Sequence, residues 1–353
     1  MPAAPHIVVV GGGIAAVEFI LALDEAAGTR VRTTLVAPDE ELLVRPTLVA
    51  APSQHFPLQT IADDIGFTFV RAALDAVEPR RIRLRGGGTL EYDTLVLAPG
   101  ARRLPAFDDA LQLPDELHVL HEEIDRGAVT DVAFVVPTLR GWVLPAYEAA
   151  LLTGHRHPDL AITLVSPEPT PLAMFGLEAS VQVAAALDRV GVHRTAELPE
   201  GARVVALPLL RGPEISGVPR TGLYGLIPVD EHLRVRGLQR VYALGDATDF
   251  PLKHGGIACQ QADAAAAHIA APLTAAPFTP RLEAILLTGE EPIVLGGAPA
   301  KVPGRLLAPY LETAAARSSI SDTSRMAPRS ADVAMAAYAR RAGDTTRSRP
   351  TGE

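Results

Sequence analysis

The sequence predicts an α/β fold built from two Rossmann-like domains, the second of them shortened. A β-branched run, three consecutive glycines, a helical segment and a second strand follow one another within residues 6–37. The same order of strand and helix returns over residues 131–190, with a weaker turn signal. The chain has 353 residues, of which 48% are hydrophobic, so it can bury the cores of two ordinary domains.

Composition argues against several classes of protein. The formal net charge of −9 disfavours a general nucleic-acid binder, which would carry a basic surface. A single cysteine, Cys259, allows no disulfide or dithiol pair within the chain, and the usual zinc cluster is missing. The sequence has no run of about 18 apolar residues and no signal-peptide pattern. We therefore expect a cytoplasmic protein without a metal site, a transmembrane segment or a nucleic-acid partner.

The first glycine cluster joins a strand at residues 6–10 to a helix at residues 14–27. Gly11 permits the tight turn, Gly13 lets the backbone approach a pyrophosphate, and Ala16 is small enough for the helix to pack on the strand. The helix N-terminus offers N–H groups and a partial positive charge to phosphates. The pattern indicates a dinucleotide site, and the alternative is an ordinary glycine turn.

The acidic residue that usually contacts the ribose of a dinucleotide is displaced in this sequence. Ala37 ends the second strand (residues 32–37) where the carboxylate is expected, and Asp39 follows in the loop. Asp39 either replaces it from the loop or is a solvated turn residue. The departure affects the predicted ribose contact and leaves the phosphate site unchanged.

Further elements extend the alternating pattern. The sequence predicts strands at residues 94–97, 132–136, 161–165, 204–207 and 240–244, and helices at 144–153, 177–190 and 257–270. Residues 313–353 hold few large apolar side chains, so they are predicted to form a disordered tail. The predicted organisation is a discontinuous first domain (1–120 and 221–275), a degenerate second domain (121–220), a C-terminal closing segment (276–312) and the tail.

Three later motifs carry a family resemblance. Residues 92–101 resemble the segment that returns to the flavin domain in pyridine nucleotide-disulfide type flavoproteins, and residues 241–247 resemble the second flavin motif of that superfamily. Residues 251–263 are similar to the loop and helix over the flavin in the branch with type II NADH dehydrogenases and sulfide:quinone oxidoreductases. The resemblance covers about residues 5–312.

The resemblance implies two domains of the FAD/NAD(P)-binding type and non-covalent FAD in the first. Asp246 would bind the ribityl or phosphate end of FAD, and Gly256 and Ile257 would begin a helix whose N-terminus faces the isoalloxazine. Such a helix end stabilises the negative charge of reduced flavin. The implied cofactor-binding residues are Gly11, Gly12, Gly13, Ile14, Ala15, Ala16, Pro38, Arg45, Ala98, Pro99, Gly100, Gly245, Asp246, Gly256 and Ile257.

Four residues near the second flavin motif allow two interpretations each. Lys253 is the candidate catalytic residue, a cation beside the flavin or the acceptor, and the alternative is a solvent-facing lysine. Asp246 can be a flavin ligand or an ordinary carboxylate at a strand end. For His254, an ordinary loop residue is the favoured interpretation, and the alternative is a proton shuttle. For Cys259, a small buried residue of the helix is the favoured interpretation, and the alternative is a thiol beside the flavin.

The second domain departs from the family pattern. Pro137 stands near the position of the first glycine and has no N–H to donate, and Trp142 would crowd a pyrophosphate. Only Gly141 remains in this turn, and no β-meander follows residues 191–193. The sequence therefore disfavours NAD(P)H binding, although an unusual NADH site at Gly141 stays open. Paired cysteines are absent, which disfavours sulfide oxidation by the usual route.

The sequence leads to two hypotheses of function. The first is an FAD-dependent oxidoreductase that passes electrons from an unidentified donor through FAD to a quinone or another small acceptor. The alternative is a non-enzymatic FAD-binding protein whose second domain acts as an interaction or sensing module. Peripheral membrane contact and a homodimer stay open under both hypotheses.

Overall fold

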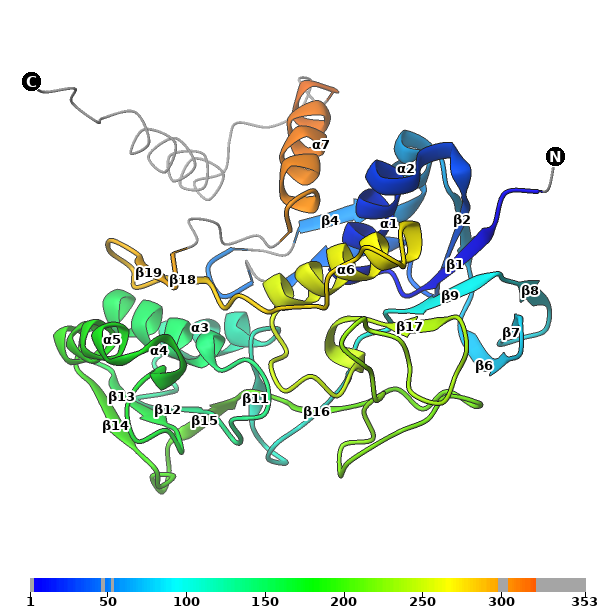
Figure 1. Cartoon of the computed structure of the whole chain (residues 1–353). Coiled ribbons are helices and arrows are strands. Elements are labelled where there is room, and N and C mark those ends of the chain that lie inside the picture. The colour runs from blue at the N-terminus through cyan, green and yellow to red at the C-terminus, as the bar shows by residue number, and fades with distance from the viewer. Residues whose placement is uncertain (1–2, 46–47, 52–53, 298–303, 322–353) are drawn as a thin grey trace, which may run out of the picture. The chain divides into compact units, whose positions relative to one another are not determined.

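The computed structural model describes residues 3–45, 48–51, 54–297 and 304–321 (Figure 1). The chain divides into two compact units, residues 1–307 and 308–353. The first unit contains two parallel β-sheets of five strands each among its described residues. The prediction of two Rossmann-like domains is therefore confirmed at the level of architecture.

The first sheet has the strand order β17-β9-β1-β2-β5, with all neighbours parallel. Its strands are β1 (His6–Val10), β2 (Arg32–Ala37), β5 (Thr68–Arg71), β9 (Thr94–Leu97) and β17 (Val241–Ala243). Val8 and Val9 are completely buried, because both faces of the sheet are covered. The chain leaves β1 for β2 on one side and later places β9 on the other, so a crevice opens at the carboxyl ends of β1 and β9.

The two faces of the first sheet are covered differently. One face carries α1 (Ile14–Ala27) and α6 (Gly255–Ala270), which pack against each other (Figure 1). The other face is covered by a three-stranded antiparallel sheet, whose Val77 and Ile82 pack with Val8 and Leu95. That sheet comprises β6 (Leu74–Glu78), β7 (Arg81–Leu84) and β8 (Thr89–Glu91).

The second sheet has the order β11-β15-β12-β13-β14 and is also parallel. Its strands are β11 (Leu111–Gln112), β12 (Asp131–Val135), β13 (Ala161–Val165), β14 (Val192–Thr195) and β15 (Arg203–Ala206). Its helices are α3 (Leu117–Asp125), α4 (Leu144–Arg156) and α5 (Leu177–Arg189). Since β12 lies between β13 and β15, this sheet has a second crevice at the carboxyl ends of β12 and β15.

The domain limits differ in detail from those predicted. β11 belongs to the second sheet although its residues precede position 121. The predicted limit falls after it, because a strand of two residues leaves no periodic signal in the sequence. Residues 196–202, between β14 and β15, contain no strand, in agreement with the missing meander. The domains are linked by the antiparallel pair β10 (Arg102–Leu104) and β16 (Leu209–Arg211).

The remaining elements are short. A hairpin of β18 (Ala284–Leu286) and β19 (Ile293–Leu295) adds Leu286 and Leu295 to the core of the second sheet. In the first domain, the antiparallel pair β3 (Glu41–Val44) and β4 (Gln54–Pro57) precedes α2 (Leu58–Ile65). The predicted closing segment, 276–312, includes residues 298–303, which lie outside the described residues.

Helix α7 (Leu307–Ser321) continues into the second unit. The prediction that disorder begins at residue 313 is wrong for residues 313–321, which are helical. The three alanines at 314–316 have high helix propensity, and this outweighs the lack of large apolar side chains. The rest of the predicted tail, residues 322–353, lies outside the described residues.

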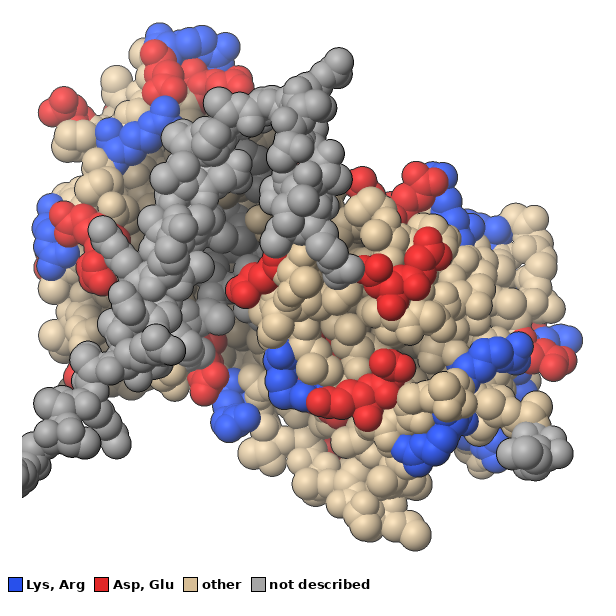
Figure 2. Space-filling model, turned by 90° about the horizontal axis from the view of Figure 1, so that it is seen from above, with Lys and Arg blue, Asp and Glu red and all other residues tan. Residues whose placement is uncertain are grey.

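Charged side chains form small groups of mixed sign on the face that Figure 2 shows. Among the described residues, ion pairs join Arg81 to Glu78 at 2.6 Å and Arg83 to Asp75 at 2.7 Å. Among the described residues, no helix is long and apolar enough to cross a membrane.

Candidate functional site

A cavity of about 1400 Å³ lies across the carboxyl ends of both parallel sheets. Residues that follow β1, β2, β9 and β17 line it from the first domain, and residues that follow β12 and β15 line it from the second. Both crevices therefore open into one space. Pockets for small molecules commonly measure about 300–1,000 Å³, so this cavity has room for a large nucleotide and a second small molecule.

The first glycine turn lies at one end of this cavity. Gly11 has a φ of +120°, which only glycine adopts easily, whereas Gly13 precedes α1 with extended backbone. A Cβ atom added to Gly13 would meet no atom within 4 Å, so its front is open. No side chain caps α1. The N–H of Ala16 donates to the carbonyl oxygen of Gly13 at 3.0 Å, so the N–H groups of Ile14 and Ala15 are the ones available to a ligand.

The predicted residues of this turn divide into two groups. Gly11, Gly12, Gly13, Ile14 and Ala15 line the cavity. Ala16 is completely buried and lines no part of the cavity, which agrees with its predicted packing role and separates it from the ligand-facing residues.

The loop after β9 closes the turn from the other side of the crevice. Ala98, Pro99 and Gly100, which are predicted cofactor-binding residues, all line the cavity. The backbone N–H of Ala98 donates to the carbonyl oxygen of Val10 at 2.8 Å, so the ends of β1 and β9 are fixed together. The turn and the loop form a cradle of bare backbone that can hold a diphosphate.

The end of β2 contributes polar side chains. Ala37 is completely buried, and Pro38 and Asp39 line the cavity beyond it. Asp39 is exposed, so a ribose contact from the loop and a solvated turn residue both stay open. Arg45, at the end of β3, also lines the cavity, and its Nε lies 3.8 Å from the Asp115 carboxylate.

The second flavin-like motif forms the opposite wall. Gly245 has a φ of +67°, and its N–H donates to the side chain of Gln261 in α6 at 2.7 Å. Asp246 follows and lines the cavity. Burial raises the pKa of the Asp246 carboxyl, while the nearby charges of Lys253 and Arg103 act in the opposite direction.

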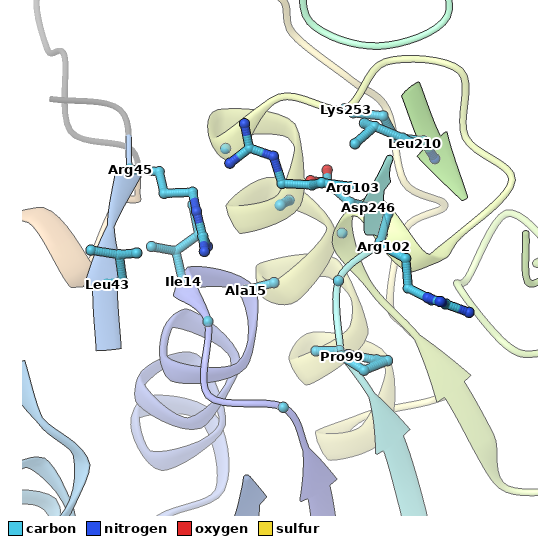
Figure 3. Close-up of a pocket in the computed structure, with 18 of the residues that line it drawn as sticks. Ile14, Ala15, Leu43, Arg45, Pro99, Arg102, Arg103, Leu210, Asp246 and Lys253 are labelled. Carbon is cyan, nitrogen blue, oxygen red and sulfur yellow. The ribbon is translucent and has the colours of Figure 1, made fainter. Parts of the chain in front are cut away.

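Lys253 lines the same cavity as Asp246 and Arg103, and Figure 3 labels all three in its wall. Its ammonium group donates to the carbonyl oxygen of Thr248. Burial lowers the pKa of Lys253 to about 8, against the opposing effect of Asp246 and Asp249. The structure thus places Lys253 in the cavity wall rather than in open solvent.

The predicted contacts at the start of α6 are shifted along the helix. The sequence predicts that Gly256 and Ile257 face the cofactor. In the structure, Gly255 and Ala258 line the cavity instead. The Ile257 side chain is buried in the core, with 1% of its surface exposed. The helix begins at Gly255, earlier than predicted, so residues three apart share the cavity-facing side. No side chain caps this helix, and its N-terminus also opens toward the cavity.

Residues of the second domain close the cavity on the far side. Pro137, Thr138, Arg140, Gly141 and Trp142 line it after β12. The ring centroids of Trp142 and His254 lie 4.2 Å apart, so an aromatic contact joins the two domains.

The carboxylate at the end of β13 is engaged within the protein. Glu168 is buried, and it accepts a hydrogen bond of 2.6 Å from the hydroxyl of Tyr147. In a Rossmann fold, an acidic residue in this region contacts the ribose of the nucleotide. Because Tyr147 already occupies an oxygen of Glu168, this carboxylate is less suited to that contact.

Sequence reasoning missed Arg103 and Glu148. Arg103 lines the cavity and forms an ion pair with Asp115, and Glu148 lines it from α4 and accepts the backbone N–H of Leu287 at 3.0 Å. Asp115 and Leu287 lie in loops outside the elements of Arg103 and Glu148, so no local spacing marks these contacts. Cys259 is buried, and burial raises the pKa of its thiol well above its usual value, as expected for a packing residue. Among the described residues, no group of three or more His, Cys, Asp or Glu side chains could hold a metal ion.

Comparison with solved structures identifies proteins of the same fold. The structure matches the sulfide:quinone oxidoreductase of Aquifex aeolicus with a TM-score of 0.70 and 19% identity, over 88% of this chain and 89% of that chain. It matches a ferredoxin reductase of Rhodopseudomonas palustris with a TM-score of 0.62 and 19% identity, over 84% and 83%. It matches a NAD-dependent persulfide reductase of A. fulgidus with a TM-score of 0.60 and 18% identity, over 80% and 61%.

These matches define the class of the fold. The chain has the two-domain architecture of these reductases, which confirms at the level of fold the resemblance inferred from the sequence motifs. Scans of the sequence against protein-family models and against curated proteins found no match.

Proposed function

We propose that the protein is an FAD-dependent oxidoreductase that passes electrons from a small-molecule donor to a quinone or another small acceptor. The observation that carries this proposal is one continuous cavity that begins at the open glycine turn and ends between the two domains. When bound, FAD supplies the electron-transfer chemistry. The protein supplies position, charge and exclusion of water.

The diphosphate of FAD is assigned to the turn at the start of α1. Gly13 leaves the space in front of the turn free, and the uncapped N–H groups of α1 point toward it. The loop from Ala98 to Gly100 would enclose the same group from the other side of the crevice. Asp39 would contact the ribose from the loop after β2.

The flavin end of the cofactor is assigned to the wall formed by Asp246, Lys253 and the start of α6. The uncapped helix N-terminus at Gly255 and the ammonium of Lys253 would both stabilise negative charge on a reduced ring. Asp246 would bind the polar chain next to the ring. Lys253 is the catalytic residue that we assign, with a role in charge stabilisation.

The donor that we propose is a small molecule other than NAD(P)H. Pro137 has no N–H for a phosphate, and Trp142 occupies the turn while it contacts His254. Glu168 is bonded to Tyr147. These three features support a second domain that shapes the substrate side of the cavity and binds no dinucleotide of its own.

The test is an anaerobic titration of the purified yellow protein, followed by absorption of the flavin. A donor panel that includes NADH, NADPH and sulfide is added, and a quinone is then supplied. Rapid bleaching by one donor and recovery with the quinone would establish an oxidoreductase. Fast bleaching by NADH would contradict the proposed donor class. Failure of all donors would favour a non-enzymatic flavoprotein.

A further inference from the structure

A small side pocket of about 30 Å³ adjoins the main cavity and shares four lining residues with it, namely Thr138, Arg140, Leu210 and Lys253. About 10–15 Å³ is enough for one water molecule, so this pocket can take a group of a few atoms. The rest of its wall is formed by Tyr224, Leu226, Asp249, Phe250 and Pro251. A ligand that fills it would extend into the main cavity.

Lys253 brings hydrogen-bond donors to this pocket that the protein does not use. An ammonium group has three N–H donors. The Lys253 ammonium donates to the carbonyl oxygen of Thr248, and no carboxylate of the described residues lies within 4.0 Å of it. Donors therefore remain for a ligand on the pocket side.

Arg140 provides a second cation on the same wall. Its guanidinium lies 5.8 Å from the centre of the Tyr224 ring, and among the described residues it forms no ion pair with a carboxylate. Two arginines of the main cavity wall differ from Arg140, because Arg102 pairs with Glu214 at 3.9 Å and Arg103 pairs with Asp115. The planar guanidinium of Arg140 is thus left to bind an anion.

The pocket contains one acidic residue, which does not neutralise both cations. Asp249 lies in the wall, and one of its carboxylate oxygens accepts the backbone N–H of Val229 at 3.2 Å. The pocket wall therefore contains two basic residues and one acidic residue. Leu210, Leu226 and Phe250 add apolar surface beside the two basic residues.

We propose that the side pocket binds the carboxylate of a small organic acid, whose apolar body lies in the main cavity. The assignment of this acid as the redox substrate rests on the proposed function, and it narrows the substrate class to organic anions. Carboxylate binding itself requires only the geometry of Arg140, Lys253 and the pocket.

The experiment compares benzoate with benzamide, which have the same ring and differ in charge, by titration calorimetry on the purified protein. We expect benzoate to bind at least about 10-fold more tightly, since hydrogen bonds to charged groups are the stronger ones. Arg140→Gln should weaken benzoate binding by about 10-fold and leave benzamide unchanged. The matched control, Arg102→Gln, removes an equal charge from the main cavity and should change the benzoate Kd by less than about twofold.

Two results would overturn the inference: equal binding of benzoate and benzamide to the unaltered protein, or equal effects of the two substitutions. The first comparison uses no variant, so it stands even if Arg140→Gln fails to fold. Flavin content is read separately from the absorption spectrum. A yellow protein without a preference for benzoate would refute the carboxylate site alone, and a colourless folded protein with the preference would refute the flavin assignment alone.

Discussion

The backbone of Gly11 approaches Ala98 so closely that a Cβ atom on Gly11 would lie 2.1 Å from the carbonyl oxygen of Ala98. This approach joins the ends of β1 and β9 at the crevice of the first sheet. Gly13, two residues further on, has open space where its Cβ would be. The two glycines therefore have different roles: Gly11 allows the close approach of two backbones, and Gly13 keeps the space in front of the turn open.

Gly13→Val should give folded protein that binds no FAD. The backbone at Gly13 is extended, which valine tolerates, and the new side chain would project into the space assigned to the diphosphate. Circular dichroism and the visible absorption spectrum check the two halves of this prediction. Normal FAD content in the variant would exclude this position for the diphosphate.

Gly11→Ala is the matched comparison. It combines a φ of +120° with a collision against Ala98, so the free energy of unfolding should fall by more than about 2 kcal/mol. Urea denaturation measures this change. A variant as stable as the unaltered protein would show that the close approach of the two backbones is not required.

Lys253 should titrate near pH 8 in the flavin-free protein. The sequence contains only two lysines, Lys253 and Lys301, so NMR of protein with ¹³C-labelled lysine resolves each one. Burial lowers the pKa of Lys253 to about 8, while Asp246 and Asp249 oppose the shift. Asp246→Asn should therefore lower the pKa further. A signal near the ordinary lysine value of 10.5 would show that Lys253 is solvated.

The same shift predicts how stability depends on pH. Between about pH 8 and 10.5, the folded chain leaves Lys253 neutral, whereas the unfolded chain protonates it. The unfolded state then binds more protons, so the Lys253 contribution to the free energy of unfolding should rise with pH across this range. Lys253→Met should flatten the rise. Identical slopes for the two proteins would contradict the shift.

Glu18 should be important for the stability of the first unit. It is completely buried in α1 and accepts the N–H groups of Leu306 at 3.1 Å and Leu307 at 2.6 Å. Glu18→Ala leaves both donors without this partner, so the free energy of unfolding should fall by about 2–4 kcal/mol. Glu25→Ala is the control, because it removes an exposed carboxylate paired with Arg305 and should cost much less than Glu18→Ala. Equal losses in the two variants would contradict the buried role of Glu18.

Tyr147→Phe should destabilise the second domain. The Tyr147 hydroxyl is buried and donates to Glu168, whose carboxylate would lose this partner. We expect a loss of about 1–3 kcal/mol in thermal or urea unfolding. Tyr224→Phe, at a half-buried tyrosine with Arg140 over its ring, should be near neutral. If both variants unfold alike, the buried hydrogen bond adds no stability.

Much of the fold could be predicted from the sequence, because its elements carry strong local signals. The strands at His6–Val10 and Ala161–Val165 and the helix at Ile14–Ala27 have the limits that periodicity gave. β11 could not be predicted, since its two residues become a strand only by pairing with β15. The helix at residues 313–321 was not predicted, because the small number of large apolar side chains indicated disorder, whereas the alanines there favour a helix.

The candidate site could be predicted where it depends on backbone conformation. Gly11, Gly13, Ala98 and Gly245 lie at strand ends, and parallel strands bring those ends together. Side-chain partners across the domains could not be found in this way. Arg103 reaches Asp115 through the antiparallel connection, and that ion pair leaves no spacing in the sequence.

The most direct test of the central claim is the absorption spectrum of the purified protein, with identification of the nucleotide released on denaturation. Flavin absorption and about one FAD per chain are the expected result, since the open turn at Gly13 and the cavity beyond it suit a dinucleotide. A folded, colourless protein that takes up no FAD when the cofactor is added would contradict the flavin site and the oxidoreductase function together.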